Sequence, residues 1–413
     1  MSRELVNDFL LVSRYADPPA EATVIQALSS AGLGMAAYQP AEPDSKQTAR
    51  VRVGTYRLTT PGSATPATVR VTVAQHSKPA LAGMGEGAFN QLTRRLSAED
   101  VQTLRAGTLT CDVRLKTSEE QAPVTLRWAM GIVRALVSLT SGAVIDPAAQ
   151  TSWGASQLGQ MLAGPLTAQM SVHDEAWGSD RRWLHTHGLQ KFGCTELDLA
   201  AIPVALRAEA EAFLLEVADN LANGQRLSAG QEIDMDDLGS VVAVSAAPDA
   251  EHSAPFGRLR LADIPEPGER QGASAARLLT RMAFAEAQRR RETGDTAGAL
   301  DVIERILSAN SDDCAATFLK ASILLDGRLP HEALALGELM ELRTPIDYRG
   351  PLAVGLSLLA IGRSREALNA LDRAIEREPE AAQAFAARAQ AYRLLGDERR
   401  ASMDHARAVY LGV

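Results

Sequence analysis

Two histidines placed two residues apart are the residues in this sequence best suited to metal or acid–base chemistry. His185 and His187 occur in the segment Trp183-Leu184-His185-Thr186-His187, whose alternating side chains are typical of a β-strand. Successive side chains of a strand point to opposite faces, so Trp183, His185 and His187 share one face. Two imidazoles at this spacing, roughly 7 Å apart at Cα, can share a metal ion when a third ligand comes near.

The third ligand would have to come from a nearby acidic or imidazole side chain. His173, Glu196 and Asp198 are the candidates in the sequence. A site needs convergent partners, and the pair alone does not supply them. We therefore favour a structural role, with the imidazoles hydrogen bonded to backbone or carboxylates, and predict no metal, cofactor or catalytic residue. Metal binding or acid–base catalysis at His185 and His187 is the alternative.

The residues after this pair continue a recognisable pattern. His185-Thr186-His187-Gly188-Leu189, Phe192-Gly193 and Glu196-Leu197 resemble a motif of bacterial domains of unknown function. The resemblance implies no activity. Gly188 and Gly193 are expected to end strands and shape the turn between them.

Around this motif, the N-terminal part alternates predicted strands and helices. The pattern predicts an α+β domain over 1–263, a two-layer sandwich with a mixed or antiparallel sheet that divides into layers over 1–150 and 151–263. A polar stretch rich in proline and glycine, 264–274, predicts a linker. The expected strands are 8–14, 49–58, 67–73, 109–115, 143–146, 181–186, 195–199, 241–245 and 256–261, and the expected helices are 21–30, 123–139 and 204–222.

The C-terminal third repeats itself. Gly294, Gly327, Gly362 and Gly396 recur about 34 residues apart. Most of them follow one apolar helical run and precede a second. This spacing predicts helical pairs, each of which leaves an apolar face that only a neighbouring pair can bury.

The residues around these glycines resemble the tetratricopeptide family. Small residues and a proline stand at the family's positions, namely Ala299 after Gly294, Ala367, Ala374 and Pro379 after Gly362, and Ala401 and Ala408 after Gly396. The resemblance implies an all-α array of stacked helix pairs over 275–413 that binds other proteins.

The resemblance also implies that the first helix of each pair lines a concave groove. Such a groove would have an apolar floor with arginines along it, and it would contain Arg281, Phe284, Gln288, Arg291, Thr317, Ala321, Leu324, Arg349, Leu352, Leu356, Gln383, Gln390 and Arg393. Guanidinium groups suit the carboxylates of an extended or helical peptide, although arginines on a surface are often only solvated. We predict a non-enzymatic adaptor that binds a protein or peptide partner there. The alternative is an enzyme or metal-binding domain centred on His185 and His187, whose targets the repeats recruit.

The composition excludes several other functions. The 413 residues are 46% apolar and 4% aromatic and carry a formal net charge of −9, and they show no basic stripe, so we expect no nucleic-acid partner. No segment approaches the roughly 20 apolar residues of a membrane span, and residues 1–11 lack the apolar run of a signal peptide. The three widely separated cysteines do not indicate disulfides. These features predict a cytoplasmic protein without a membrane partner.

Overall fold

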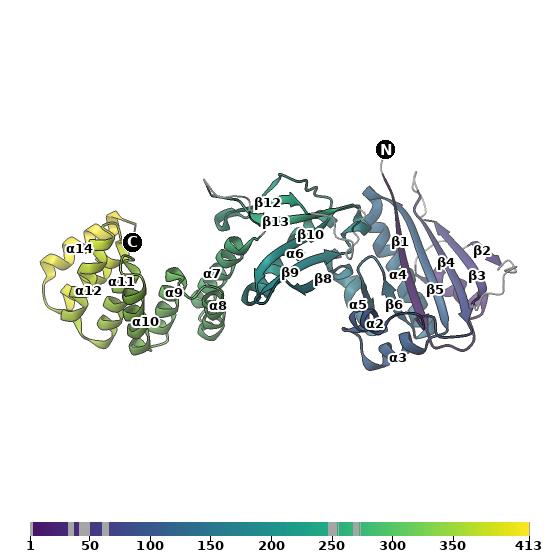
Figure 1. The fold of residues 1–413 in the computed structure, drawn as a ribbon, viewed down its shortest axis with the longest axis horizontal. Coiled ribbons are helices and arrows are strands. Elements are labelled where there is room, and N and C mark those ends of the chain that lie inside the picture. The colour runs from purple at the N-terminus through teal and green to yellow at the C-terminus, as the bar shows by residue number, and fades with distance from the viewer. Residues whose placement is uncertain are drawn as a thin grey trace. The chain divides into compact units, whose positions relative to one another are not determined.

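In the computed structural model the chain folds into two compact units (Figure 1). The first unit comprises Met1–Ala201, Ala210–Asp234 and Ser240–Ala275, and the second comprises Ile202–Glu209, Met235–Gly239 and Ala276–Val413. The predicted domain over 1–263 is therefore not contiguous, because two short segments of it belong to the second unit. The structure describes residues 3–31, 37–40, 50–59, 66–246, 254, 256–266, 272 and 274–412, and most of the predicted linker at 264–274 lies outside them.

The first unit contains a seven-stranded antiparallel sheet with the strand order β2-β3-β4-β5-β1-β6-β7. The predicted hairpin is confirmed by the antiparallel pairing of β3 with β4. The predicted boundary at 150 falls too early, because β7 pairs with β6 in this sheet. The strands are β1 (Glu4–Ser13), β2 (Ala37–Pro40), β3 (Arg50–Thr59), β4 (Thr68–His76), β5 (Leu109–Ser118), β6 (Ala143–Asp146) and β7 (Thr151–Trp153).

Helix α4 (Ala122–Thr140) packs against strands β1, β5 and β6 of this sheet. Leu126, Met130, Val133 and Val137 are buried at helical spacing, as the sequence predicts for one apolar face. Together with the preceding turn, this helix is long and apolar enough by composition to cross a membrane, contrary to the expectation from sequence. Half of that segment is buried inside the protein, as in the core helix of an ordinary domain.

A second sheet completes the first unit, with the strand order β11-β12-β13-β10-β9-β8. It is mixed, because β10 and β13 run parallel whereas β8 and β9 run antiparallel. The α+β class predicted from sequence is confirmed. The strands are β8 (Ser171–Ala176), β9 (Arg181–His187), β10 (Glu196–Pro203), β11 (Glu232–Asp234), β12 (Ser240–Ser245) and β13 (Arg258–Asp263).

The other helices of the N-terminal part are short, apart from α6. The sequence pattern predicts α1 and α6 but not α2, α3 and α5, nor strands β2, β7, β8 and β11. Helices of eight or nine residues carry too few turns to show a clear apolar period. These helices are α1 (Glu21–Ser30), α2 (Glu86–Thr93), α3 (Ala98–Ala106), α5 (Ala155–Ala163) and α6 (Arg207–Ala222).

The second unit is dominated by eight consecutive helices that pack in sequence, each on the next (Figure 1). Gly294, Gly362 and Gly396 have φ of +80°, +86° and +81°, the left-handed conformation that lets the chain leave the first helix of a pair. The helices are α7 (Ala276–Glu292), α8 (Thr296–Ala309), α9 (Cys314–Asp326), α10 (Pro330–Arg343), α11 (Arg349–Ile361), α12 (Ser364–Arg377), α13 (Ala382–Leu394) and α14 (Glu398–Tyr410).

Small residues set the distance between these helices. Ala367 and Ala374 of α12 are fully buried in the core that α12 shares with α11 and α13. Gly337 lies inside α10, where a Cβ would come within 2.8 Å of the backbone nitrogen of Val354 on α11. A glycine inside a helix weakens it, but here it lets the two helices approach closely.

Candidate functional site

The first helices of the four pairs form one continuous layer. Helix α9 packs against both α7 and α11, and α11 packs against α13. This layer is the surface on which the sequence predicts the binding groove.

Most of the predicted groove residues are accessible on this layer. Arg281, Gln288, Arg291, Gln383, Gln390 and Arg393 are exposed, and Phe284, Thr317, Arg349 and Leu356 are half-buried. The half-buried apolar side chains also contact their neighbours, since Leu356 packs against the core around α11, α12 and α13.

Three predicted groove residues are instead part of the core. Leu352 is 0% exposed, Ala321 1% and Leu324 7%. Leu352 packs with α12 and α13 residues such as Leu371, while Ala321 and Leu324 pack with Ala333 and Ala353. Their assignment to the groove floor is wrong because these side chains point between helices, where a partner cannot reach them.

Arg291 connects the first two helices of the layer. Its Nε donates to a carboxylate oxygen of Asp326 on α9 over 2.5 Å, and both side chains keep substantial exposure, 37% and 52%. Arg349 is held differently. It pairs with Asp347 over 3.1 Å, and its guanidinium lies 5.5 Å from the centre of the Tyr348 ring. Both guanidinium groups are thus oriented by side chains of the same array.

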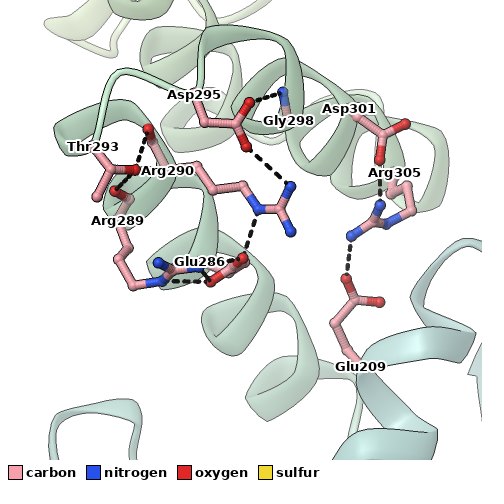
Figure 2. Close-up of polar contacts among 9 residues, drawn as sticks. All are labelled: Glu209, Glu286, Arg289, Arg290, Thr293, Asp295, Gly298, Asp301 and Arg305. Carbon is pink, nitrogen blue, oxygen red and sulfur yellow. Dashed lines mark hydrogen bonds and ion pairs between the residues drawn. The ribbon is translucent and has the colours of Figure 1, made fainter.

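The two arginines that precede Arg291 in α7, Arg289 and Arg290, make their contacts within the first pair (Figure 2). Glu286 accepts hydrogen bonds from Arg289 at 2.8 Å and Arg290 at 2.6 Å, and these bonds, Arg289 first, lower its pKa to about 2. Arg290 also contacts Asp295, which caps α8 by accepting the Gly298 amide hydrogen. Arg291 is therefore the one of the three consecutive arginines that pairs with the next first helix.

A second contact of the first pair ties α8 to the first turn of α6 (Figure 2). Arg305 donates to Glu209 over 2.7 Å and to Asp301 over 2.5 Å. Glu209 belongs to the second unit by its contacts, although it is distant in sequence.

The fourth pair contains a charged cluster that sequence analysis does not identify. Arg388 of α13 donates to both carboxylate oxygens of Asp404 on α14, at 2.7 and 2.8 Å, and to Asp372 on α12 at 2.7 Å. The pKa of Arg388 is raised, chiefly by the hydrogen bonds to Asp404. This cluster joins three helices, and the low exposure of Arg388 and Asp404 makes it structural and not a part of the groove.

In the first unit, the motif after His187 forms a tight turn closed by one carboxylate. Glu196 accepts hydrogen bonds from the Thr186 hydroxyl at 2.7 Å and from the Gly188 and Gln190 amides at 2.9 and 3.2 Å. Gly188 and Gly193 have φ of +112° and +75°, so both glycines shape the turn as predicted. Glu196 is therefore occupied in the turn and is not the third ligand of the histidine pair.

The same motif places a lysine in the interior. The Lys191 ammonium donates to a carboxylate oxygen of Asp146 over 2.6 Å and also to the Gln169 carbonyl, and Lys191 and Asp146 are both 0% exposed. The other Asp146 oxygen accepts the amides of Ala148 and Ala149. This ion pair joins the end of β6 to the turn that follows β9.

Of the three candidates for a third ligand, His173 lies beside His185 and His187. His173 on β8 lies opposite His185 on β9 in the antiparallel register. Asp198 is instead held by Arg260, whose Nε donates to one of its carboxylate oxygens over 2.7 Å. Strand β8 is not predicted from the sequence, so only the pairing of the two strands reveals which candidate lies beside the pair.

Comparisons with known proteins agree with the helical layer. A tetratricopeptide repeat family model matches residues 284–343 and 352–410. The C-terminal helices are tetratricopeptide repeats. The tetratricopeptide repeats suggest interaction with other proteins. No curated protein matches this chain in sequence.

Solved structures with similarity to the repeats include a thermophilic tetratricopeptide protein of Thermus thermophilus, TTC0263. It is 24% identical over 32% of this chain and 74% of its own, with a TM-score of 0.31. MamA from Desulfovibrio magneticus is 18% identical over 32% of this chain and 75% of its own, with a TM-score of 0.27.

Proposed function

We propose that the tetratricopeptide repeats bind an acidic, extended segment of a protein partner along their first helices. The observation that carries the proposal is a repeated pair of polar side chains. Gln288 and Arg291 on α7 stand in the same relation to Gly294 as Gln390 and Arg393 on α13 do to Gly396. All four side chains are exposed, so an amide and a guanidinium are accessible at each end of the layer.

Helices α9 and α11 lie between these two polar ends. Their residues at the positions that correspond to the glutamine and the arginine are apolar. They are Ala321 and Leu324 on α9 and Leu359 on α11, which are buried, and Leu356 on α11, which is half-buried and accessible to a partner. A segment with acidic residues at two places and an apolar residue between them that contacts Leu356 fits this order. Guanidinium groups take carboxylates in bidentate fashion, and apolar contacts along the middle add affinity without fixing direction.

The proposal describes an adaptor that acts in a reducing compartment such as the cytoplasm. Cys111, Cys194 and Cys314 are free thiols, which suits such a compartment. An acidic partner also fits the arginines of the first helices better than a nucleic acid would.

Selection from a display library of short random peptides on the full-length protein tests the proposal. We expect selected peptides to be enriched in Asp and Glu and to bind Arg291→Gln/Arg393→Gln at least tenfold more weakly. Arg399→Gln, which changes an exposed arginine on α14, is the control and should bind as the parent does. Selected peptides that lack acidic residues, or that bind the double variant unchanged, would overturn the proposal.

A further inference from the structure

Three histidine side chains converge on one face of the six-stranded sheet. His173, His185 and His187 each offer a ring nitrogen, and these three nitrogens all lie within 4.8 Å of one another. Their exposures are 2%, 0% and 2%. The ring centroids of His173 and His187 are 4.3 Å apart, and those of His185 and His187 are 4.9 Å apart.

The convergence follows from strand register and not from a flexible loop. Antiparallel pairing sets His173 opposite His185 and Ser171 opposite His187. Side chains two residues apart on one strand share a face, so all three imidazoles rise from the same patch of two hydrogen-bonded strands. Such a frame holds ligands with little loss of conformational entropy on binding.

We propose that His173, His185 and His187 bind a divalent transition-metal ion, with zinc the expected occupant. Zinc bonds imidazole nitrogen at about 2.0–2.1 Å in tetrahedral geometry, which places ligand nitrogens roughly 3.4 Å apart. The ring nitrogens lie within 4.8 Å of one another, so their separations exceed this value by at most about 1.4 Å, which small side-chain rotations can close. Imidazole ligands without a nearby thiolate suit zinc and related borderline ions better than calcium or magnesium.

Groups around the cluster match what a metal site requires. The Gln91 side-chain amide on α2 lies 3.3 Å from His173 Nδ1. If Gln91 turns its carbonyl oxygen to this nitrogen, it accepts the Nδ1 hydrogen and leaves Nε2 for the metal. Trp183 covers His185, with ring centroids 4.2 Å apart, and limits access of solvent from that side.

A carboxylate at the rim can balance part of the ion's charge. Glu175 lies on the same face of β8, and its Oε1 is 3.9 Å from His185 Nε2. It is partly exposed, which provides a route for the ion and an oxygen atom for the fourth position. Arg258 is a cation on this side, and its guanidinium lies over the Trp183 ring, 5.4 Å from the ring centre.

Cobalt is the most direct probe, because tetrahedral Co²⁺ has intense visible absorption that octahedral aqueous Co²⁺ lacks. Full-length protein without a histidine tag is stripped with a chelator and titrated with CoCl₂, then with ZnCl₂. We expect the tetrahedral bands to saturate at one equivalent, zinc to displace cobalt, and zinc to raise the melting temperature. Absence of the bands and of any thermal shift at one equivalent would overturn the proposal.

Substitutions then assign the ligands. His173→Gln, His185→Gln and His187→Gln should each abolish the cobalt bands, whereas His331→Gln, which changes an exposed histidine on α10, should leave them unchanged. Gln91→Leu should weaken affinity by about 10- to 100-fold without removing the bands. If a buried variant fails to fold, the titration of the parent protein and of Gln91→Leu still decides the matter. Retention of the bands in the three folded histidine variants would show that the metal binds elsewhere.

Discussion

The carboxylate of Asp326 lies 2.5 Å from Nε of Arg291 and links α9 to α7 across the layer of first helices. Asp326 is therefore already bound to the guanidinium group that we propose binds a carboxylate of the peptide. Any acidic peptide must compete with it. This competition makes the effect of removing Asp326 opposite in sign to the effect of removing Arg291.

Asp326→Asn is expected to tighten the binding of a selected acidic peptide by up to about fivefold. An exposed ion pair contributes roughly 0.2–1 kcal/mol of free energy. A peptide that no longer has to break this pair gains up to that amount in binding free energy. Fluorescence anisotropy with a labelled peptide measures the change. Asp301→Asn breaks an exposed ion pair on α8 and is the matched control, which should leave affinity unaltered. Weaker binding by Asp326→Asn would place the peptide elsewhere.

Leu352→Ala is expected to cost about 2–5 kcal/mol of unfolding free energy, because Leu352 is completely buried in the core around α11 and α12. Gln390→Ala, at an exposed position of the same helical layer, should change stability by less than about 0.5 kcal/mol. Urea denaturation of the full-length protein followed by circular dichroism compares the two. Equal costs would mean that Leu352 is not a core residue.

Lys191→Met is expected to destabilise the first unit by about 3–5 kcal/mol, because it leaves the Asp146 carboxylate buried without its counter-ion. The double variant Lys191→Met/Asp146→Asn should recover much of this loss. The carboxamide that replaces the Asp146 carboxylate keeps an oxygen for the Ala148 and Ala149 amides and carries no charge. Thermal denaturation of both variants checks the coupling, and additive losses would contradict it.

Glu196 is expected to make the stability of the first unit depend on pH. Burial raises its pKa to about 7, against the opposing hydrogen bonds from Thr186, Gln190 and Gly188. Between the ordinary carboxyl pKa near 4.3 and about 7, the folded state binds the proton more tightly than the unfolded state does. Unfolding free energy should therefore fall as pH rises through this window, by on the order of 1–3 kcal/mol.

Comparison with Glu196→Gln isolates this contribution from those of the other titratable groups. The variant should lack the decline between pH 5 and 7 when both proteins are unfolded with urea at a series of pH values. A parallel decline in parent and variant would assign the pH dependence to other groups.

Much of the fold follows from sequence because local pattern and tertiary structure agree. The glycine period predicts the repeats, and the alternation around His185 correctly places Trp183, His185 and His187 on one face. Helix α4 is found because its apolar face runs over five turns.

The remaining features depend on contacts between distant segments. Three of the six residues of strand β8 are His173, Asp174 and Glu175, a composition that is not typical of a strand. The position of His173 beside His185 and His187 is therefore known only from the register of the sheet. Leu352 and Leu356 lie one helical turn apart, yet Leu352 belongs to the core that α11 shares with α12 and α13, whereas Leu356 packs against that core and stays partly exposed. The ion pair of Lys191 with Asp146 joins residues whose proximity depends on the arrangement of the two sheets.

Photo-crosslinking tests the central claim, that a peptide lies along the first helices, most directly. A selected peptide carrying benzoylphenylalanine in place of one apolar residue is irradiated with the full-length protein, and the crosslinked residues are mapped by mass spectrometry. We predict crosslinks on α7, α9, α11 and α13, with the photoreactive group reaching residues near Phe284 or Leu356, and their loss in Arg291→Gln/Arg393→Gln. Crosslinks confined to α8, α10, α12 and α14, or to the first unit, would contradict the claim.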